Sequence, residues 1–134
     1  MTALPRVAPA AQGDASGAAF RAFLRIAELW QLTVEEQLVL LGRPARSTYF
    51  KWKKEGAAAL PHDTLERLSY LLGSYKALQV LLPDPVPADG WVRRANRDPL
   101  FGGRSALERM LSGQVADLYV VRQYVDAQLG GWPG

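Results

Sequence analysis

The chain has 134 residues, enough for one domain or for a small domain with an appended module. It contains no cysteine and a single histidine, His62, which excludes a disulfide framework, a cysteine-ligated metal and any site that needs two imidazoles. No run approaches the roughly 18 apolar residues that span a bilayer, and the N-terminus lacks the basic start and apolar block of a signal peptide. We therefore expect a cytoplasmic protein that has no membrane partner.

The net charge of +3 is unevenly distributed along the chain. Residues 1–82 carry ten lysines and arginines against seven acidic residues, whereas residues 83–134 carry six of each sign. The basic excess therefore lies in the first part of the chain, where a polyanionic partner would bind.

The N-terminal residues differ in pattern from those that follow. Residues 1–16 mix proline, alanine and glycine without an apolar period, so we expect a disordered tail. From Phe20 to Trp30, large apolar residues recur at helical spacing and predict a helix over residues 16–31. This helix opens a first domain that we assign to residues 17–82.

Two short helices separated by a glycine-containing turn come next. The run Thr33-Val-Glu-Glu36 has the form of a capping box, which predicts a helix over residues 33–41, ended by Gly42. A second short helix, over residues 46–54, is closed by Gly56. Two helices joined by such a turn, the second one basic, are typical of a helix-turn-helix.

A longer helix and a linker complete the first domain. The helix begins at His62 and runs to Leu82, and Gly73-Ser74 would permit a kink or a restart within it. Residues 83–90 then include the proline-rich run PDPVPAD, which predicts a non-helical linker.

The remaining residues, 91–134, are assigned to a second small helical domain. A short helical piece is expected from Trp91 to Asn96, and the run Ser105-Ala-Leu-Glu108 is a second capping box, whose helix stops at Gly113. The last helix covers residues 114–129, with one apolar face formed by Leu118, Val121, Val125 and Leu129. No alternating run predicts a strand, so the expected fold class is all-α.

The basic helix 46–54 is the first candidate functional element. Tyr49 and Trp52 lie three residues apart and are expected to pack inward, against the first and fourth helices, which leaves the polar residues outside. Five basic residues and no acidic one lie between Arg43 and Lys54, which suits phosphate contacts. The predicted DNA-binding residues are Arg43, Arg46, Ser47, Thr48, Lys51 and Lys54. The alternative is a solvated face with no partner.

An ordered series of short motifs marks the C-terminal part. From Trp91 the sequence reads WVRRANRDPLFGGRSALERMLSGQVADLYVVRQYVDAQLGGW. The series resembles the toxin-binding domain of Xre/MbcA/ParS-like antitoxins, the partners of RES-domain toxins. The resemblance covers residues 20–132, because those antitoxins carry an Xre-like helix-turn-helix ahead of this domain.

The resemblance implies an antitoxin that neutralises a RES toxin, an NAD-consuming enzyme similar to ADP-ribosyltransferases, and that represses its own operon. It also implies a homodimer, a larger hetero-oligomer with the toxin, and a C-terminal segment lying over the toxin's active-site entrance. Trp132 is a large ring on a glycine-rich tether, which suits an interface anchor unless it folds back on its own domain. The residues expected to contact the toxin are Arg122, Tyr124, Asp126, Gly130, Gly131 and Trp132. Trp91 is instead expected to be a core residue that joins the two domains.

The sequence offers little support for an enzyme. His62 stands beside Asp63 at a predicted helix start, where a surface cap is the expected role, and no phosphate-loop, dinucleotide or zinc-protease motif occurs. We therefore expect no catalytic residue, no cofactor and no metal. Two alternatives stay open: a stand-alone helix-turn-helix regulator whose C-terminal helices only dimerise, and DNA binding by the assembled toxin complex alone.

Overall fold

The computed structural model describes the backbone of residues 3–130 and the side chains of residues 15–130. Within residues 3–130 the chain forms seven α-helices, one 3-10 helix and no strand, so the predicted all-α class is confirmed. None of the helices in this part of the chain has both the length and the apolar character needed to cross a membrane. In chain order the elements are α1 (Ala3–Leu29), α2 (Val34–Leu40), α3 (Arg46–Glu55), α4 (His62–Leu81), α5 (Pro85–Gly90), η1 (Trp91–Arg93), α6 (Ala106–Met110) and α7 (Val115–Gln128).

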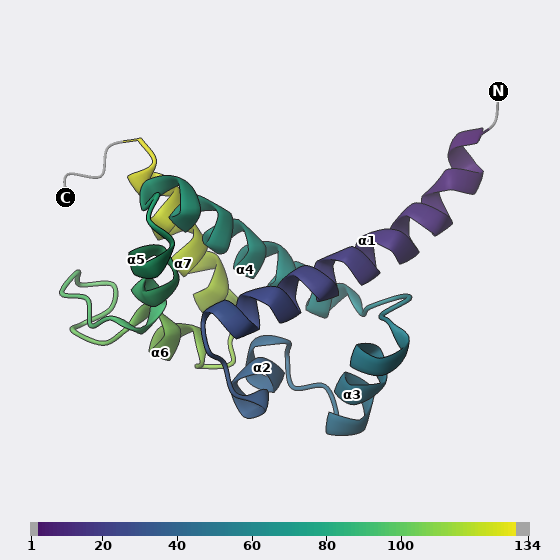
Figure 1. The fold of residues 1–134 in the computed structure, drawn as a ribbon, viewed down its shortest axis with the longest axis horizontal. Coiled ribbons are helices and arrows are strands. Elements are labelled where there is room, and N and C mark those ends of the chain that lie inside the picture. Colours follow the sequence, from purple (N-terminus) through teal and green to yellow (C-terminus); the bar gives the residue numbers. More distant parts are fainter. Residues whose placement is uncertain (1–2, 131–134) are drawn as a thin grey trace.

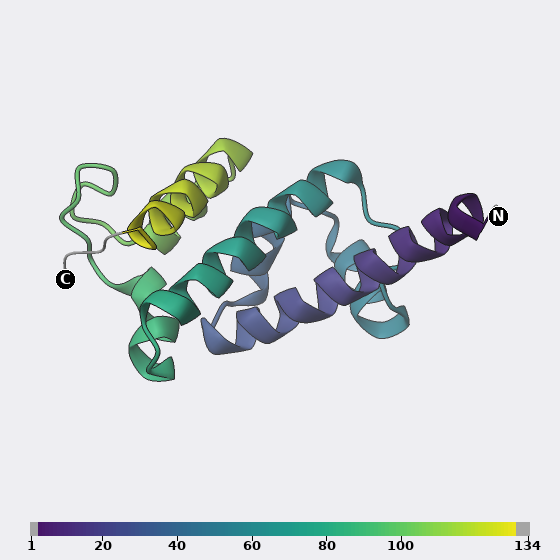
Figure 2. The same ribbon diagram turned by 90° about the horizontal axis from the view of Figure 1, so that it is seen from above.

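Helix α4 is the central element of the fold. It lies between α1 on one side and α7 on the other, while α2 and α3 sit together beside α1 and the start of α4 (Figures 1 and 2). Its buried residues include Leu68, Leu71 and Leu78, which belong to one apolar core shared by the helices of both predicted domains. The helix runs unbroken through Gly73 and Ser74, so the permitted restart does not occur.

The first helix is longer than predicted. It begins at Ala3, so the expectation of a disordered tail is wrong for residues 3–16 with respect to secondary structure. This segment is rich in alanine, the strongest helix former, and Pro5 falls in the first turn, where its missing N–H removes no intrahelical bond. Figures 1 and 2 show the N-terminal turns of α1 extending beyond the other helices.

The predicted linker is also helical. Helix α5 covers residues 85–90, because Asp84 caps it by accepting a hydrogen bond from the Val86 N–H (3.2 Å) and Pro85 occupies its first position. The helix is held to α4 by full burial of Ala88 and by a bond from Gln79 Nε2 to Asp89 Oδ1 (3.0 Å). The expectation of an irregular linker over residues 83–90 is therefore wrong.

The second half of the chain follows its predicted pattern more closely. Ser105 and Glu108 form the capping box of α6, as expected, but the helix ends at Met110, and Gly113 then adopts a left-handed φ of 90°. Helix α7 buries Leu118, Val121 and Val125. Leu129, predicted on the same apolar face, follows the last helical residue and is 48 % exposed.

Trp91 is buried, as expected of a core residue. Its ring stacks on Tyr124 (centroids 6.2 Å apart) and meets the edge of Phe101 (6.1 Å). Both of these partners belong to the second predicted domain. The ring contacts described here therefore tie η1 to α7 and to the loop before α6.

Candidate functional site

The turn between α2 and α3 is fixed by backbone hydrogen bonds. Helix α2 starts at the Thr33–Glu36 capping box that the sequence predicts. At its end, the Arg43 N–H donates to the Leu38 carbonyl (2.7 Å) and the Gly42 N–H donates to the Val39 carbonyl (3.1 Å). These two bonds form a Schellman motif, which satisfies the last carbonyls of the helix.

Gly42 and Arg43 both adopt left-handed conformations in this turn, with φ of 93° and 63°. A side chain at Gly42 would clash, because its Cβ would lie 2.7 Å from Asp63 Oδ2 and 2.9 Å from Arg67 Nε on α4. Arg67 is itself buried and paired with Asp63 (2.9 Å). The turn is therefore pressed against the first turns of α4, which determines how α3 leaves it.

Two aromatic residues hold α3 against the rest of the fold. Tyr49 is fully buried, and its hydroxyl donates to Gln37 Oε1 on α2 (2.5 Å). The ring of Phe20 on α1 meets Tyr49 (6.1 Å) and half-buried Trp52 (5.7 Å) edge-on. The predicted inward packing of Tyr49 and Trp52 is confirmed for α1. Burial raises the pKa of the Tyr49 phenol above its usual value.

The opposite face of α3 is exposed and largely polar. Arg46, Ser47, Lys51 and Lys54 all lie on the surface, whereas Thr48 is half-buried. Arg46 forms an ion pair with Glu35 of α2. Arg46, Ser47, Lys51 and Lys54 thus share the exposed face and Thr48 lies at its edge, although the acceptor that Arg46 contacts here is a carboxylate of its own chain.

Arg43 stands apart from this face. It is exposed, and its guanidinium lies near the turn that precedes α7, because a Cβ built on Gly113 would be 3.5 Å from Arg43 Nη2. The turn of the helix-turn-helix motif therefore approaches the second half of the chain at this point.

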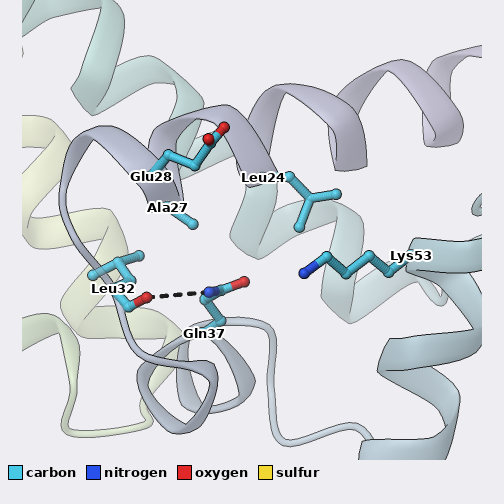
Figure 3. A pocket seen from close by; sticks show the side chains of 6 residues that line it. All are labelled: Leu24, Ala27, Glu28, Leu32, Gln37 and Lys53. Atoms are coloured by element: carbon cyan, nitrogen blue, oxygen red, sulfur yellow. Dashed lines mark hydrogen bonds between the residues drawn. The ribbon is translucent and has the colours of Figure 1, made fainter.

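Beside this motif is an open hollow of about 410 Å³. Figure 3 shows its lining: Leu24, Ala27, Glu28, Leu32, Gln37 and Lys53. The amide of Gln37 is engaged on both sides, since Oε1 accepts from Tyr49 and Nε2 donates to the Leu32 carbonyl (3.2 Å). The charged groups of the lining, Glu28 and Lys53, come from α1 and α3. Through Gln37 the arrangement braces α2 against α3.

His62 is exposed at the start of α4 and does not form the side-chain cap that its position suggested. Among the described side chains of residues 15–130, no group of three or more from histidine, aspartate and glutamate is placed to hold a metal ion.

The predicted toxin-contacting residues of α7 have partners in their own chain. Arg122 donates from Nε to Asp126 Oδ2 (2.8 Å) and from Nη1 to the Ser69 carbonyl on α4 (3.2 Å). Half-buried Tyr124 packs edge-on against Phe101 (5.1 Å) and stacks on Trp91. Gly130 is exposed, and Gly131 and Trp132 lie outside the described residues. The structure thus places Arg122 and Asp126 together and sets Tyr124 in an aromatic cluster.

Sequence reasoning missed Arg93, which joins the two halves of the chain. Its guanidinium donates to the carbonyls of Trp30 (2.9 Å) and Gln31 (2.7 Å) and lies 3.3 Å from Glu36 Oε1. These carbonyls end α1, where a cation also favours the helix dipole. No local pattern identifies such a contact, because its partners are some 60 residues away in the sequence.

Comparison with known proteins finds two family matches along the chain. Residues 9–73 match the antitoxin Xre-like helix-turn-helix domain, and residues 77–131 match the antitoxin Xre/MbcA/ParS C-terminal toxin-binding domain. A curated relative, the uncharacterized protein y4oB of Sinorhizobium fredii (strain NBRC 101917 / NGR234), is 54% identical over 114 residues. The match covers 85% of this chain and 86% of the relative. No solved structure matches the chain. The two matched ranges meet within α4.

Proposed function

Because the chain belongs to the Xre/MbcA/ParS-like antitoxins, we propose that it neutralises a cognate RES-domain toxin and represses its own operon by binding operator DNA. The observation that carries the proposal is the pairing of a toxin-binding domain with an exposed basic face on α3, presented by a rigid turn. Such a protein is not an enzyme, and it acts in the cytoplasm, where its toxin and its operator are found.

The DNA-binding part of the proposal is supported by the charges of the turn and of α3. Arg46, Lys51 and Lys54 are exposed on a helix held by Tyr49, and Arg43 lies in the turn before it. Cations fixed on one face contact phosphates without rearrangement of the helix and supply salt-dependent affinity. Ser47 and Thr48 lie in the first turn of α3, and in this proposal they approach base edges, as the N-terminal residues of recognition helices do.

The toxin-binding part is supported by the series of C-terminal motifs and by the matched toxin-binding domain. In this proposal the toxin is the NAD-consuming RES enzyme, and residues 130–134 cover the entrance to its active site. Arg122, Tyr124 and Asp126 supply contacts from α7. Two antitoxin chains associate, and the pair assembles with toxin into a larger complex.

One experiment tests both activities with reciprocal variants. The chain is coexpressed with the RES-domain protein encoded in the neighbouring reading frame, and growth and cellular NAD are measured. Binding to the promoter region of its own gene is measured in parallel. Deletion of residues 130–134 should weaken neutralisation and leave operator binding intact. Arg46→Ala and Lys51→Ala should each weaken operator binding and leave neutralisation intact.

The salt dependence of operator binding gives a further check on α3. Lys51→Ala should lower the slope of log affinity against log salt by about one unit, as expected for a lost phosphate contact. The matched control is Lys76→Ala, because Lys76 is an exposed lysine of α4 outside the helix-turn-helix motif. If the Arg46→Ala and Lys51→Ala variants bound DNA normally at low salt, α3 would not be the helix that contacts the operator.

The competing function is a stand-alone regulator whose C-terminal helices only dimerise. It requires that deletion of residues 130–134 leaves the neutralisation of any toxin unchanged and that no RES-domain protein is encoded nearby. Operator binding that occurs only with toxin present would instead assign DNA recognition to the assembled complex.

A further inference from the structure

Helix α3 carries an exposed apolar ring within its basic face. Phe50 is 43 % exposed, whereas Tyr49 beside it is fully buried and Trp52 is half-buried. Its neighbours at helical spacing are Arg46, one turn before, and Lys54, one turn after. Exposure of a phenyl ring to water is unfavourable in free energy, so an exposed ring among cations suggests a surface that a partner covers. Phe50 is thus an apolar group on the surface to which operator binding has been assigned.

The ring is held from behind. Phe50 meets the edge of Tyr49 (centroids 5.0 Å apart, planes at 81°), and Tyr49 is anchored through its hydroxyl to Gln37. Tyr49 is also braced by Phe20 of α1. A ring supported in this way projects from α3 in a defined direction instead of sweeping over the surface.

The ring is also flanked by charge. The guanidinium carbon of Arg46 lies 5.8 Å from the centroid of Phe50, a cation–π distance. Because Arg46 and Phe50 are neighbours on one helix face, a major groove that admits one admits the other. Lys51 and Lys54, which continue this face, are placed for the phosphates on either side.

We infer that Phe50 reads the 5-methyl group of a thymine in the operator. The inference rests on the proposed operator binding and names one of its specificity-determining residues. The thymine methyl is the apolar feature that the major groove displays, and side chains such as phenylalanine contact it. Phe50 is the fifth residue of α3, within the N-terminal half that recognition helices direct to base edges.

The test removes the methyl group without changing base pairing. The operator is located by footprinting with the full-length protein on the promoter region of its own gene. Labelled duplexes are then made in which each thymine is replaced in turn by uracil. Affinities are measured for the wild type, Phe50→Ala and Phe50→Leu, after circular dichroism has shown that each variant is folded.

At one thymine in each half-site, uracil should weaken wild-type binding about fourfold, the worth of one buried methyl group. Phe50→Ala should bind the unmodified operator more weakly and should not distinguish uracil from thymine at that position. Phe50→Leu should retain part of the discrimination. Uracil at the other thymines should affect the wild type and Phe50→Ala equally.

Several results would overturn the inference in distinguishable ways. A wild type that binds the operator but tolerates uracil at every position, or a Phe50→Ala variant that keeps the thymine preference, would remove Phe50 from base reading and leave operator binding standing. A wild type that binds no promoter DNA, with or without the toxin, would remove operator binding and the role of Phe50 together. Failure of Phe50→Ala to neutralise the toxin, with its operator binding unchanged, would assign the ring to a protein contact instead.

Discussion

The guanidinium group of Arg122 on α7 occupies the space that a side chain at Gly73 on α4 would need. A Cβ built on Gly73 would lie 1.9 Å from Arg122 Nη1 and 2.1 Å from Cζ. From this position Arg122 reaches the Ser69 carbonyl one turn earlier on α4. The missing side chain of Gly73 therefore lets α7 be fastened to α4 by a polar group.

Gly73→Ala and Arg122→Ala should be coupled. Alanine is favoured over glycine within a helix by about 1 kcal/mol, so Gly73→Ala should stabilise the Arg122→Ala variant by about that amount. In the wild type the gain should be largely offset, because the displaced guanidinium gives up its bond to Ser69, worth about 1 kcal/mol. Free energies of unfolding in urea for the four proteins of the cycle measure the coupling. An equal gain in both backgrounds would contradict it.

Arg93→Ala should destabilise the protein more than the same change at the adjacent arginine. Arg93 bonds the carbonyls that end α1, whereas Arg94 donates to the nearby Pro87 carbonyl (3.0 Å). Loss of bonds made by a charged, part-exposed donor should cost about 1–2 kcal/mol. Arg94→Ala should cost about 0.5 kcal/mol or less, as is usual at exposed sites.

The same measurement tests whether the two halves unfold together. Denaturation followed by both tryptophan fluorescence and circular dichroism should give one coincident transition for the wild type and for Arg93→Ala, because the core is continuous. Two separated transitions in the wild type would show that the halves are independent.

Stability should fall in alkaline solution because of Tyr49. Burial raises the pKa of its phenol in the folded protein above the value of about 10 in the unfolded chain. The contribution of the neutral Tyr49 phenol to the free energy of unfolding is complete below pH 10. It is lost as the pH rises through the folded pKa, because the unfolded chain then releases the proton more easily. Tyr49→Phe should lower the free energy of unfolding at neutral pH, by about 1–2 kcal/mol for the unpaired Gln37, and should flatten the fall above pH 10.

Tyr70 provides the comparison for this experiment. Its hydrogen bond to Glu66 (2.9 Å) raises the pKa of its phenol as well, but at a more exposed site. Tyr70→Phe should therefore flatten the alkaline fall less than Tyr49→Phe does, because solvent screens the interaction. Equal profiles for the wild type and Tyr49→Phe would show that the buried phenol is not responsible.

The elements that the sequence predicts well are those defined by local hydrogen bonds. Both capping boxes form as expected, at Thr33 and at Ser105, and Gly42 and Gly56 close α2 and α3 with left-handed φ. Their signals lie within four residues of the structure they produce, so tertiary contacts have little power to change them.

The error at residues 83–90 comes from weighing proline by its number rather than its position. Pro85 is the first residue of α5, where a missing N–H is harmless. In α1, Pro5 lies in the first turn, but Pro9 lies in the helix interior and removes one intrahelical bond, so proline position does not explain why residues 3–16 are helical. Asp84, followed by Pro85, was a readable N-cap signal. The proline content of residues 83–90, taken alone, gives no indication of this N-cap.

The candidate site could be predicted only in part. The face of α3 follows from helical spacing, because Tyr49 and Trp52 are large enough to determine which side is buried. The pairing of Arg46 with Glu35 and of Arg122 with Ser69 depends on how helices cross. Such contacts join positions that no periodicity links.

The position of α4 limits how this protein can exchange partners in evolution. The boundary between the two matched domains falls inside α4. Helix α1 packs on one side of α4 and α7 on the other, where Arg122 of α7 fills the space left by the missing side chain of Gly73. A recombination that joined residues 1–82 to a foreign C-terminal domain would place a side chain other than Arg122 against the space beside Gly73. New toxin specificity should therefore arise by point substitutions on the outer surface of α7, or by transfer of α4 and α7 as one piece.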